Sequence, residues 1–188
     1  MKEELDIALD RTKLKTLVQH ICHKVANPRD LGKTKLNKIL FYSDMEAYLS
    51  LGRPITGEEY VKYQYGPVSR HLDEVIASLE EERLIAVSEA SGYNAYIGAY
   101  NQKLFHGLKK PRLDAFSADE ISIADDMVTT ISQQHTAQSI SGHSHDVIWE
   151  SAQIGETLPY YTAFAHTLGE VTPDDMVWAQ SVLKDKGR

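Results

Sequence analysis

Two neighbouring stretches of apolar residues at helical spacing constrain the fold of this chain most. In residues 12–26, and again in residues 34–51, apolar side chains recur every three or four positions, which places them on one face of a helix. Asn27-Pro28 ends the first stretch, because the residue before a proline avoids helical torsions. Thr34 can cap the second helix, and Gly52 can close it in a left-handed conformation. The second stretch is apolar over a wider arc and therefore predicts a central helix.

The rest of the chain predicts further helices and one hairpin. Residues 52–68 indicate an irregular connection, and Ser69 begins a third helix that ends near Leu84. Two β-prone runs, 84–87 and 95–100, are separated by Ser91-Gly92-Tyr93-Asn94 and predict a hairpin. Later helices are expected at 118–134, after the capping-box pattern Ser117 to Glu120, at 136–143 and at 173–184. The predicted fold class is α+β, mainly helical, with about six helices and one small β-hairpin in a single domain, 1–188.

Composition narrows the class of protein. The 188 residues are 42% hydrophobic and 25% charged, which is typical of a soluble globular protein. The apolar runs are far shorter than the roughly 20 residues of a membrane helix, and the first residues lack the apolar stretch of a signal peptide. We therefore expect a cytoplasmic protein with no membrane partner. Cys22 is the only cysteine, which excludes an internal disulfide and a zinc site with several thiolates.

Charge is distributed unevenly along the chain. The net charge of −7 divides into +2 over residues 1–112 and −9 over residues 113–188, which predicts two faces of opposite potential. The densest basic stretch spans residues 24–38 and holds five basic residues against one acid, Asp30. That stretch is either a solvated helix face or a docking surface for an acidic partner or for phosphate.

Histidine, cysteine, serine and acidic residues do not form a recognisable catalytic or metal-binding pattern in this sequence. His20 and His23 flank Cys22 on the first helix, but a metal site needs more ligands than they supply. His143-Ser144-His145-Asp146 places a serine, histidines and an acid in sequence, whereas a triad needs these residues to converge in space. We predict a protein with no catalytic residue, no cofactor and no metal. A hydrolase or metalloenzyme built on His143 and His145 stays open as an alternative.

Tyrosine is abundant in the first half of the chain. Eight of the ten tyrosines lie between residues 42 and 100, while the whole chain has four phenylalanines. A tyrosine ring is apolar and its hydroxyl bonds to polar groups, so tyrosines suit protein interfaces as well as the edge of a core. The sequence leaves both interpretations open.

Several short motifs occur together in this region. Lys35-Leu36-Asn37-Lys38 lies on the second helix, Gly52-Arg53-Pro54-Ile55 follows it, and Tyr65-Gly66-Pro67-Val68 leads into the next helix. Ser144-His145, Trp149 and Pro159-Tyr160 follow further along. Taken together, these motifs resemble those of the Panacea domain, the SocA-like antitoxin domain, over residues 14–165. Asn37 departs from the glutamine that is common in the family, and Tyr63 lies where tryptophan is often nearby.

The resemblance implies a function and a partner. Proteins of this family are non-enzymatic antitoxins of bacteria and phages that neutralise a cognate protein toxin by binding it directly. Some act as adaptors that deliver the toxin to a cytoplasmic ATP-dependent protease, so such a protease is a second candidate partner. The oligomeric state stays open, a homo-oligomer included.

Candidate site residues follow from these motifs and from the tyrosine and charge patterns. We expect a partner-binding surface formed by Lys35, Lys38, Tyr42, Arg53 and Tyr65. We expect structural roles for Gly52, Gly66, Pro67, His145 and Trp149.

The order of the third helix and the hairpin also suggests a different function. A helix at 69–84 followed by a hairpin at 84–100 is the order found in a winged-helix DNA-binding regulator. That helix carries two arginines, Arg70 and Arg83, against five acidic residues, and the acids would repel phosphate. We therefore expect no nucleic-acid partner and keep DNA binding as the alternative to toxin binding.

Overall fold

The computed structural model describes residues 7–94, 98–143 and 152–163. Within them lie five α-helices, two 3₁₀-helices and two two-stranded antiparallel sheets. In chain order the elements are α1 (Arg11–Lys24), η1 (Pro28–Asp30), α2 (Lys33–Leu51), β1 (Tyr60–Tyr63), β2 (Gly66–Ser69), α3 (Leu72–Glu81), β3 (Ile85–Asn94), β4 (Gly98–Gly107), α4 (Ala118–Gln134), α5 (Ala137–His143) and η2 (Tyr160–Thr162). The α+β class and its mainly helical character agree with the prediction. The predicted helix at 173–184 lies outside the described residues.

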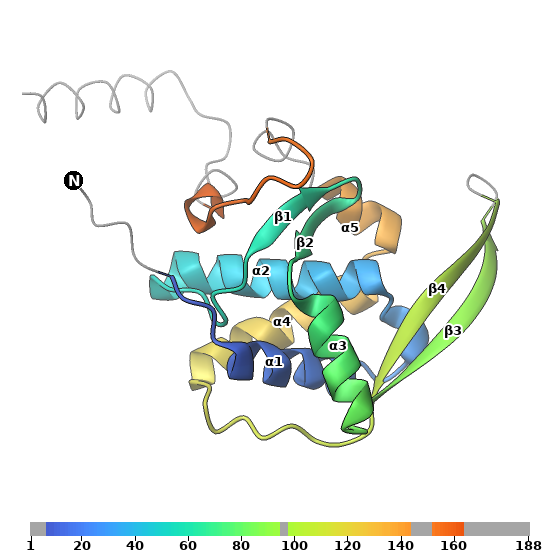
Figure 1. The fold of residues 1–188 in the computed structure, drawn as a ribbon, viewed down its shortest axis with the longest axis horizontal. Coiled ribbons are helices and arrows are strands. Elements are labelled where there is room, and N and C mark those ends of the chain that lie inside the picture. The colour runs from blue at the N-terminus through green and yellow to red at the C-terminus, as the bar shows by residue number, and fades with distance from the viewer. Residues whose placement is uncertain (1–6, 95–97, 144–151, 164–188) are drawn as a thin grey trace, which may run out of the picture.

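Helix α2 is the central element, as its wide apolar arc predicts. It runs across the middle of the molecule, with the β1–β2 hairpin on one side and α1 and α4 on the other (Figure 1). Leu36, Ile39 and Leu40 are fully buried on it. Gly52 ends the helix with φ +75°, as predicted. The prediction that Thr34 caps the helix is wrong, because the helix begins one residue earlier and Gly32 occupies the cap position without a side-chain bond.

Helices α1 and α4 pack against α2 and against each other. Asp10 caps α1 by accepting a hydrogen bond from the backbone N–H of Lys13. The predicted capping box at the start of α4 is confirmed, since Ser117 and Glu120 each accept from the other's backbone. The Lys13 ammonium lies 2.7 Å from the buried carboxylate of Glu120, so the same acid that caps α4 also ties it to α1.

The chain forms two β-hairpins where the sequence predicts one. In the hairpin of β3 and β4, Ser91–Asn94 belong to β3 and do not form the turn, and both strands are longer than predicted. The hairpin of β1 and β2 replaces the irregular connection expected at 52–68. Its strands have only four residues each, and Pro67 within β2 argues against a strand from sequence alone. Because β2 takes residues 66–69, α3 starts at Leu72 and not at Ser69.

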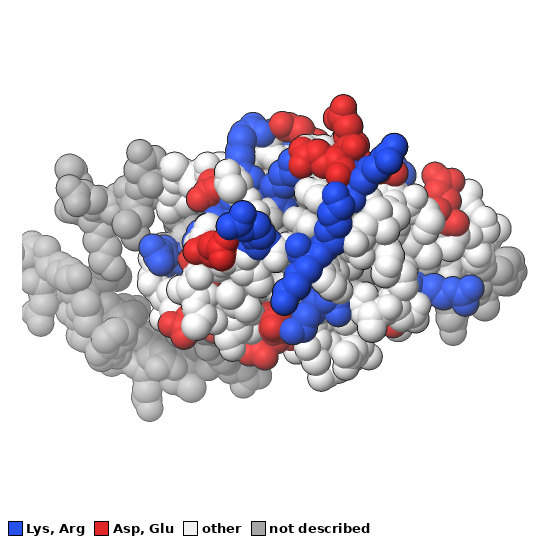
Figure 2. Space-filling view, turned by 90° about the horizontal axis from the view of Figure 1, so that it is seen from below, with Lys and Arg blue, Asp and Glu red and all other residues white. Residues whose placement is uncertain are grey.

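Part of the uneven charge along the chain forms ion pairs between packed helices. Acids of the second half pair with bases of the first half, since Asp125 on α4 lies 2.7 Å from both His20 and Lys24 on α1. Figure 2 shows acidic and basic side chains interspersed on the face seen there. None of the helices in the described residues combines the length and apolarity needed to cross a bilayer.

We expect Gly107→Ala to destabilise the fold by about 1–3 kcal/mol, because the sheet end that it occupies packs directly on α1. A Cβ at this position would lie 2.4 Å from the Cα of His23, so backbone would have to move. Urea unfolding measures the effect. Gly92→Ala on the same sheet is the control, since its Cβ would meet only the movable ring of Tyr100, and we expect a loss under about 0.5 kcal/mol. Equal losses in the two variants would contradict this account of the contact.

Candidate partner-binding surface

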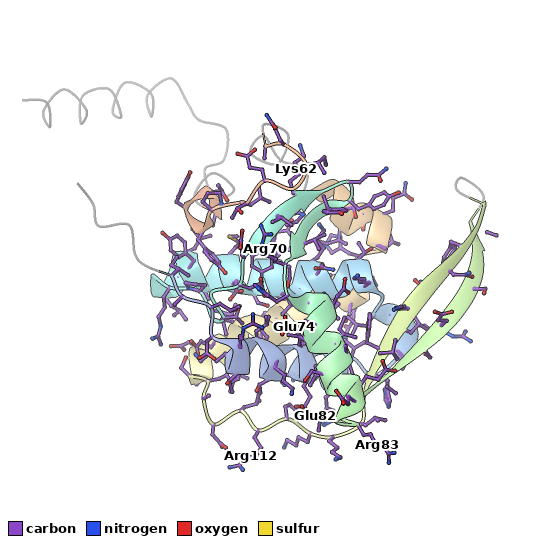
Figure 3. All side chains as sticks on the ribbon, in the orientation of Figure 1. Lys62, Arg70, Glu74, Glu82, Arg83 and Arg112 are labelled. Carbon is purple, nitrogen blue, oxygen red and sulfur yellow. The ribbon has the colours of Figure 1, made fainter. Side chains whose placement is uncertain are left out.

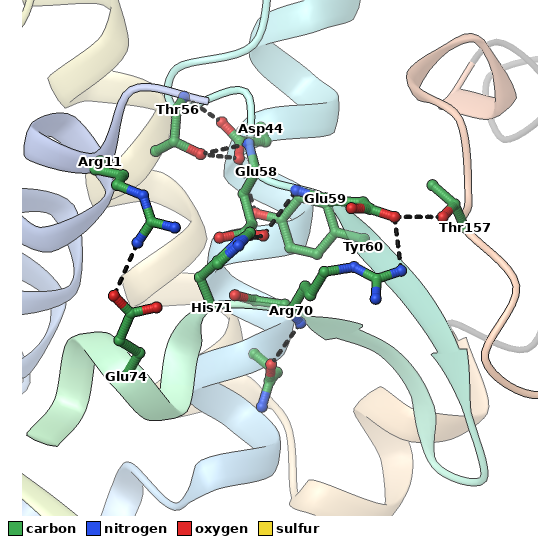
Figure 4. A network of polar contacts seen from close by, with 12 residues as sticks. Arg11, Asp44, Thr56, Glu58, Glu59, Tyr60, Arg70, His71, Glu74 and Thr157 are labelled. Carbon is green, nitrogen blue, oxygen red and sulfur yellow. Dashed lines mark hydrogen bonds and ion pairs between the residues drawn. The ribbon is translucent and has the colours of Figure 1, made fainter. Parts of the chain in front are cut away.

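A buried carboxylate on α2 holds the segment that leads into the β1–β2 hairpin. Asp44 is fully buried and accepts hydrogen bonds from the backbone N–H of Thr56 at 2.8 Å, from the Thr56 hydroxyl and from the Tyr60 hydroxyl at 2.8 Å (Figure 4). Burial raises the pKa of Asp44 to about 6, and the three donors limit that rise. These bonds fix where the hairpin starts relative to the central helix.

The segment 152–163 forms hydrogen bonds along the edge of β1 that does not pair with β2. The N–H of Lys62 donates to the carbonyl of Glu156, and the N–H of Leu158 donates to the carbonyl of Tyr60. The Lys62 ammonium also donates to the carbonyl of Ala152 at 2.8 Å (Figure 3). The Tyr160 hydroxyl then donates to the carbonyl of Glu58 at 2.6 Å, inside the polar network. The outer edge of β1 is therefore covered by this segment.

A second cluster of polar groups surrounds the start of β1. The buried carboxylate of Glu58 lies 2.9 Å from Nδ1 of His71, and Arg70 pairs with Glu59 at 2.7 Å (Figure 4). The hydroxyl of Thr157 also donates to Glu59, and these two donors hold the pKa of the Glu59 carboxyl below its usual range. The contacts link β1, the start of α3 and the segment 152–163, so the cluster stabilises the arrangement of these three parts.

A groove opens between the first half of α2 and the β1–β2 hairpin. Its volume is about 440 Å³. From α2 it is lined by Lys33, Thr34, Asn37 and Lys38, from the hairpin by Val61, Tyr63, Tyr65, Pro67, Val68 and Ser69, and beyond the hairpin by Arg70 and Asp73. Tyr63 and Tyr65 keep 56% and 64% of their surface exposed, which is high for rings of this size. A groove with exposed tyrosines at its margin has the composition of a protein interface.

Lys38 lies in this groove but is buried, with 1% of its surface exposed. Its ammonium donates to the carbonyl of Pro67 at 3.4 Å, and burial lowers the pKa of Lys38 to about 7. Next to it, the Asn37 side chain accepts from the N–H of Ser69 at 3.0 Å. Side chains of α2 therefore bond the outer edge of β2 in place of a third strand.

The structure brings some of the predicted site residues together and separates others. Lys38, Tyr65 and Pro67 line the groove, and Gly66, with φ +103°, is the first residue of β2 directly after the hairpin turn. Lys35 points to α4, where its ammonium donates to the carbonyl of Ser132 at 2.9 Å, and burial lowers its pKa. Lys35 and Lys38, which we expect on one partner-binding surface, therefore contact different elements, α4 and β2.

The remaining predicted residues lie apart from the groove. Tyr42 is partly buried against the ring of Phe41. Arg53 is exposed and lies with Gly52 in a second, smaller groove of about 240 Å³ beside Glu120. His145 and Trp149 lie outside the described residues. Sequence reasoning missed the contributions of Lys33, Asn37 and Arg70. The basic stretch 24–38 contains Lys33 and the motif Lys35-Leu36-Asn37-Lys38 contains Asn37, so these two signals could have indicated them.

Of the residues considered for catalysis or metal binding, His20 and Cys22 are buried on α1 and His23 is exposed, while the His143 side chain and His145 lie outside what the structure describes. The ring of His20 contacts Asp125, and burial raises the pKa of the Cys22 thiol to about 12, which leaves it unreactive at neutral pH. Among the described residues, no three His, Cys, Asp or Glu side chains are grouped to hold a metal.

The raised pKa of Asp44 predicts a dependence of stability on pH. A carboxyl whose pKa is about 6 when folded and 3.8 when unfolded binds its proton more tightly in the folded chain. The stabilisation that comes from this tighter proton binding is therefore present at low pH and is lost as pH rises through about 6. Between about pH 5 and 7 the free energy of unfolding falls by about 1 kcal/mol.

Asp44→Asn should remove this slope and lower stability, because an amide has one accepting oxygen where the carboxylate has two, so its NH2 group would face either the Thr56 N–H or the two hydroxyls. Urea unfolding at several pH values measures both effects. Asp73→Asn, at an exposed acid, should keep the wild-type slope. A wild-type slope in Asp44→Asn would contradict the assignment.

Comparison with known proteins identifies the domain in which this groove lies. No curated protein and no solved structure matches the chain. The family described as "Antitoxin SocA-like, Panacea domain" matches residues 36–150, which begin in α2 and include both hairpins and α4. The match covers more than half of the chain, and the chain therefore belongs to the antitoxin SocA-like Panacea family.

Proposed function

We propose that this protein is the antitoxin of a toxin–antitoxin pair and that it neutralises its cognate toxin by binding it directly, without catalysing a reaction. The observation that carries the proposal is the family match over residues 36–150, which spans most of the groove between α2 and the β1–β2 hairpin. Exposed aromatic rings supply much of the binding energy at protein interfaces. Tyr63 and Tyr65 are such rings, and they lie on the part of the groove that the hairpin forms.

The same proposal includes the compartment in which the antitoxin acts and two possible modes of action. The toxin complex forms in the cytoplasm, and the antitoxin either blocks the toxin by itself or also delivers it to an ATP-dependent protease. Affinity purification of the full chain from its host, followed by mass spectrometry, separates these roles. A stoichiometric partner that is toxic alone and harmless when expressed with this protein supports direct neutralisation, and a protease subunit in the same sample supports delivery. Recovery of the chain alone would count against both.

DNA binding remains a weaker second function. In its favour, α3 is followed directly by the β3–β4 hairpin. Against it, the first turn of α3 carries Asp73 and Glu74, and Glu80 and Glu81 lie in its last turn. These acids would repel the phosphate backbone. A mobility shift at low salt would favour this function, and no shift would remove it.

We expect Tyr65→Ala to weaken toxin binding by about tenfold or more, because the variant removes an exposed ring at the groove while leaving the core unchanged. Titration calorimetry with the purified toxin measures the affinity. Tyr161→Ala is the matched control, since Tyr161 is equally exposed but lies on η2 and does not line the groove. Equal losses in the two variants would place the toxin elsewhere on the surface.

A further inference from the structure

The buried ammonium of Lys38 has too few partners for a charged group. An ammonium carries three donors, and a buried charge is stable only when it is paired and hydrogen-bonded. Lys38 makes one hydrogen bond, to a backbone carbonyl at the long distance of 3.4 Å. Burial alone accounts for its lowered pKa, since no neighbouring charge contributes to the shift. Within residues 7–94, 98–143 and 152–163, the Lys38 ammonium therefore has no carboxylate partner.

The other charged side chains of the groove already have partners. Lys33 on α2 lies 2.6 Å from Asp73 on α3, and Arg70 lies 2.7 Å from Glu59. The hairpin contributes the hydroxyls of Tyr63 and Tyr65 and no charge to the groove. Among the residues that the structure describes as lining the groove, Lys38 is therefore the cation without a carboxylate. Pairing Lys38 would therefore require one negative charge that the lining of the groove does not supply.

We propose that this groove receives an aspartate or glutamate side chain of the toxin, whose carboxylate pairs with the Lys38 ammonium. The inference rests on the proposed function and names the chemistry of its site. A carboxylate is planar, carries a full charge and offers several acceptor positions, so it can satisfy the donors that Pro67 leaves unused. The acid enters from a protein segment, with apolar or aromatic residues beside it.

The rest of the groove favours a protein segment over a small free anion. Val61, Pro67 and Val68 give the lining apolar surface that an inorganic ion cannot use. Tyr63 and Tyr65 are large rings exposed at the same groove, and each can cover residues on either side of the entering acid. Apolar lining, two exposed rings and one unpaired cation together fit a short acidic segment.

A displayed library of random nonapeptides, selected in parallel on the full wild-type chain and on Lys38→Met, tests the proposal without the toxin. We expect the wild-type chain to enrich peptides that share an aspartate or glutamate next to apolar residues, and Lys38→Met to lose that preference. Lys24→Met is the control, because Lys24 lies on α1 outside the groove and is paired with Asp125, and it should enrich the same peptides as wild type. Wild-type peptides without a shared acid, or the same acidic peptides on Lys38→Met, would overturn the proposal.

The most strongly enriched peptide is then synthesised with its acid and with the matching amide. The change from Glu to Gln should weaken binding to the wild-type chain by more than about tenfold and should leave binding to Lys38→Met unchanged. An equal loss with both proteins would place the acid away from Lys38 and overturn the proposal.

A pH series gives a readout that does not depend on the variant's folding. The pKa of about 7 leaves Lys38 increasingly neutral as pH rises, so affinity for the acidic peptide should fall by up to about tenfold per pH unit above about pH 7. The amide peptide should lack this slope, and bound acidic peptide should raise the pKa of Lys38 measured by NMR of its side-chain carbons. Equal slopes for the two peptides would overturn the proposal.

The peptide result and the toxin result can fail separately. If the chain neutralises its toxin while the peptides show no requirement for an acid, the proposed function stands and the acid pocket is wrong. If the peptides depend on Lys38 but no toxic partner exists, the pocket stands and its occupant is not a toxin.

Discussion

The buried carboxylate of Asp44 is the interaction on which the arrangement of the hairpin depends. It lies on the central helix and accepts hydrogen bonds from Thr56 and Tyr60, while Tyr160 approaches the same oxygen at 3.4 Å. These donors come from the connection after α2, from β1 and from η2 near the far end of the described chain. One side chain therefore links three segments that are distant in sequence. The position of the β1–β2 hairpin, and with it the groove, follows from this linkage.

Helix periodicity made much of the helical body predictable. The apolar spacing in residues 34–51 and the capping box at Ser117 are local signals, and both correspond to observed elements. The β1–β2 hairpin was not predictable in this way, because its strands are short and Pro67 lies in one of them. What holds it in place is the long-range contact of Asn37 with Ser69 and of Tyr60 with Asp44. Such contacts leave no periodic pattern in a sequence.

The candidate site was predictable by residue type and only partly by position. The motifs around Lys38 and Tyr65 indicated the region of the groove, since both residues line it, and their role in partner binding stays a prediction. Lys35 and Lys38 were expected on one partner-binding surface, yet Lys35 bonds α4 and Lys38 bonds β2. Spacing of three residues leaves an angle between side chains on a helix, and on a central helix with neighbours on two sides this angle directs them to different partners.

Helix α2 carries two buried side chains of opposite charge, Asp44 and Lys38, whose hydrogen-bond partners differ. Asp44 is surrounded by donors, so both of its oxygens have hydrogen-bond partners within the fold. Lys38 has a single distant acceptor and is buried at the wall of the groove that Tyr63 and Tyr65 also line. A charge that only completes the fold would be expected to have partners like those of Asp44. The contrast indicates that Asp44 stabilises the scaffold, and it supports the proposal that Lys38 pairs with a group from another molecule.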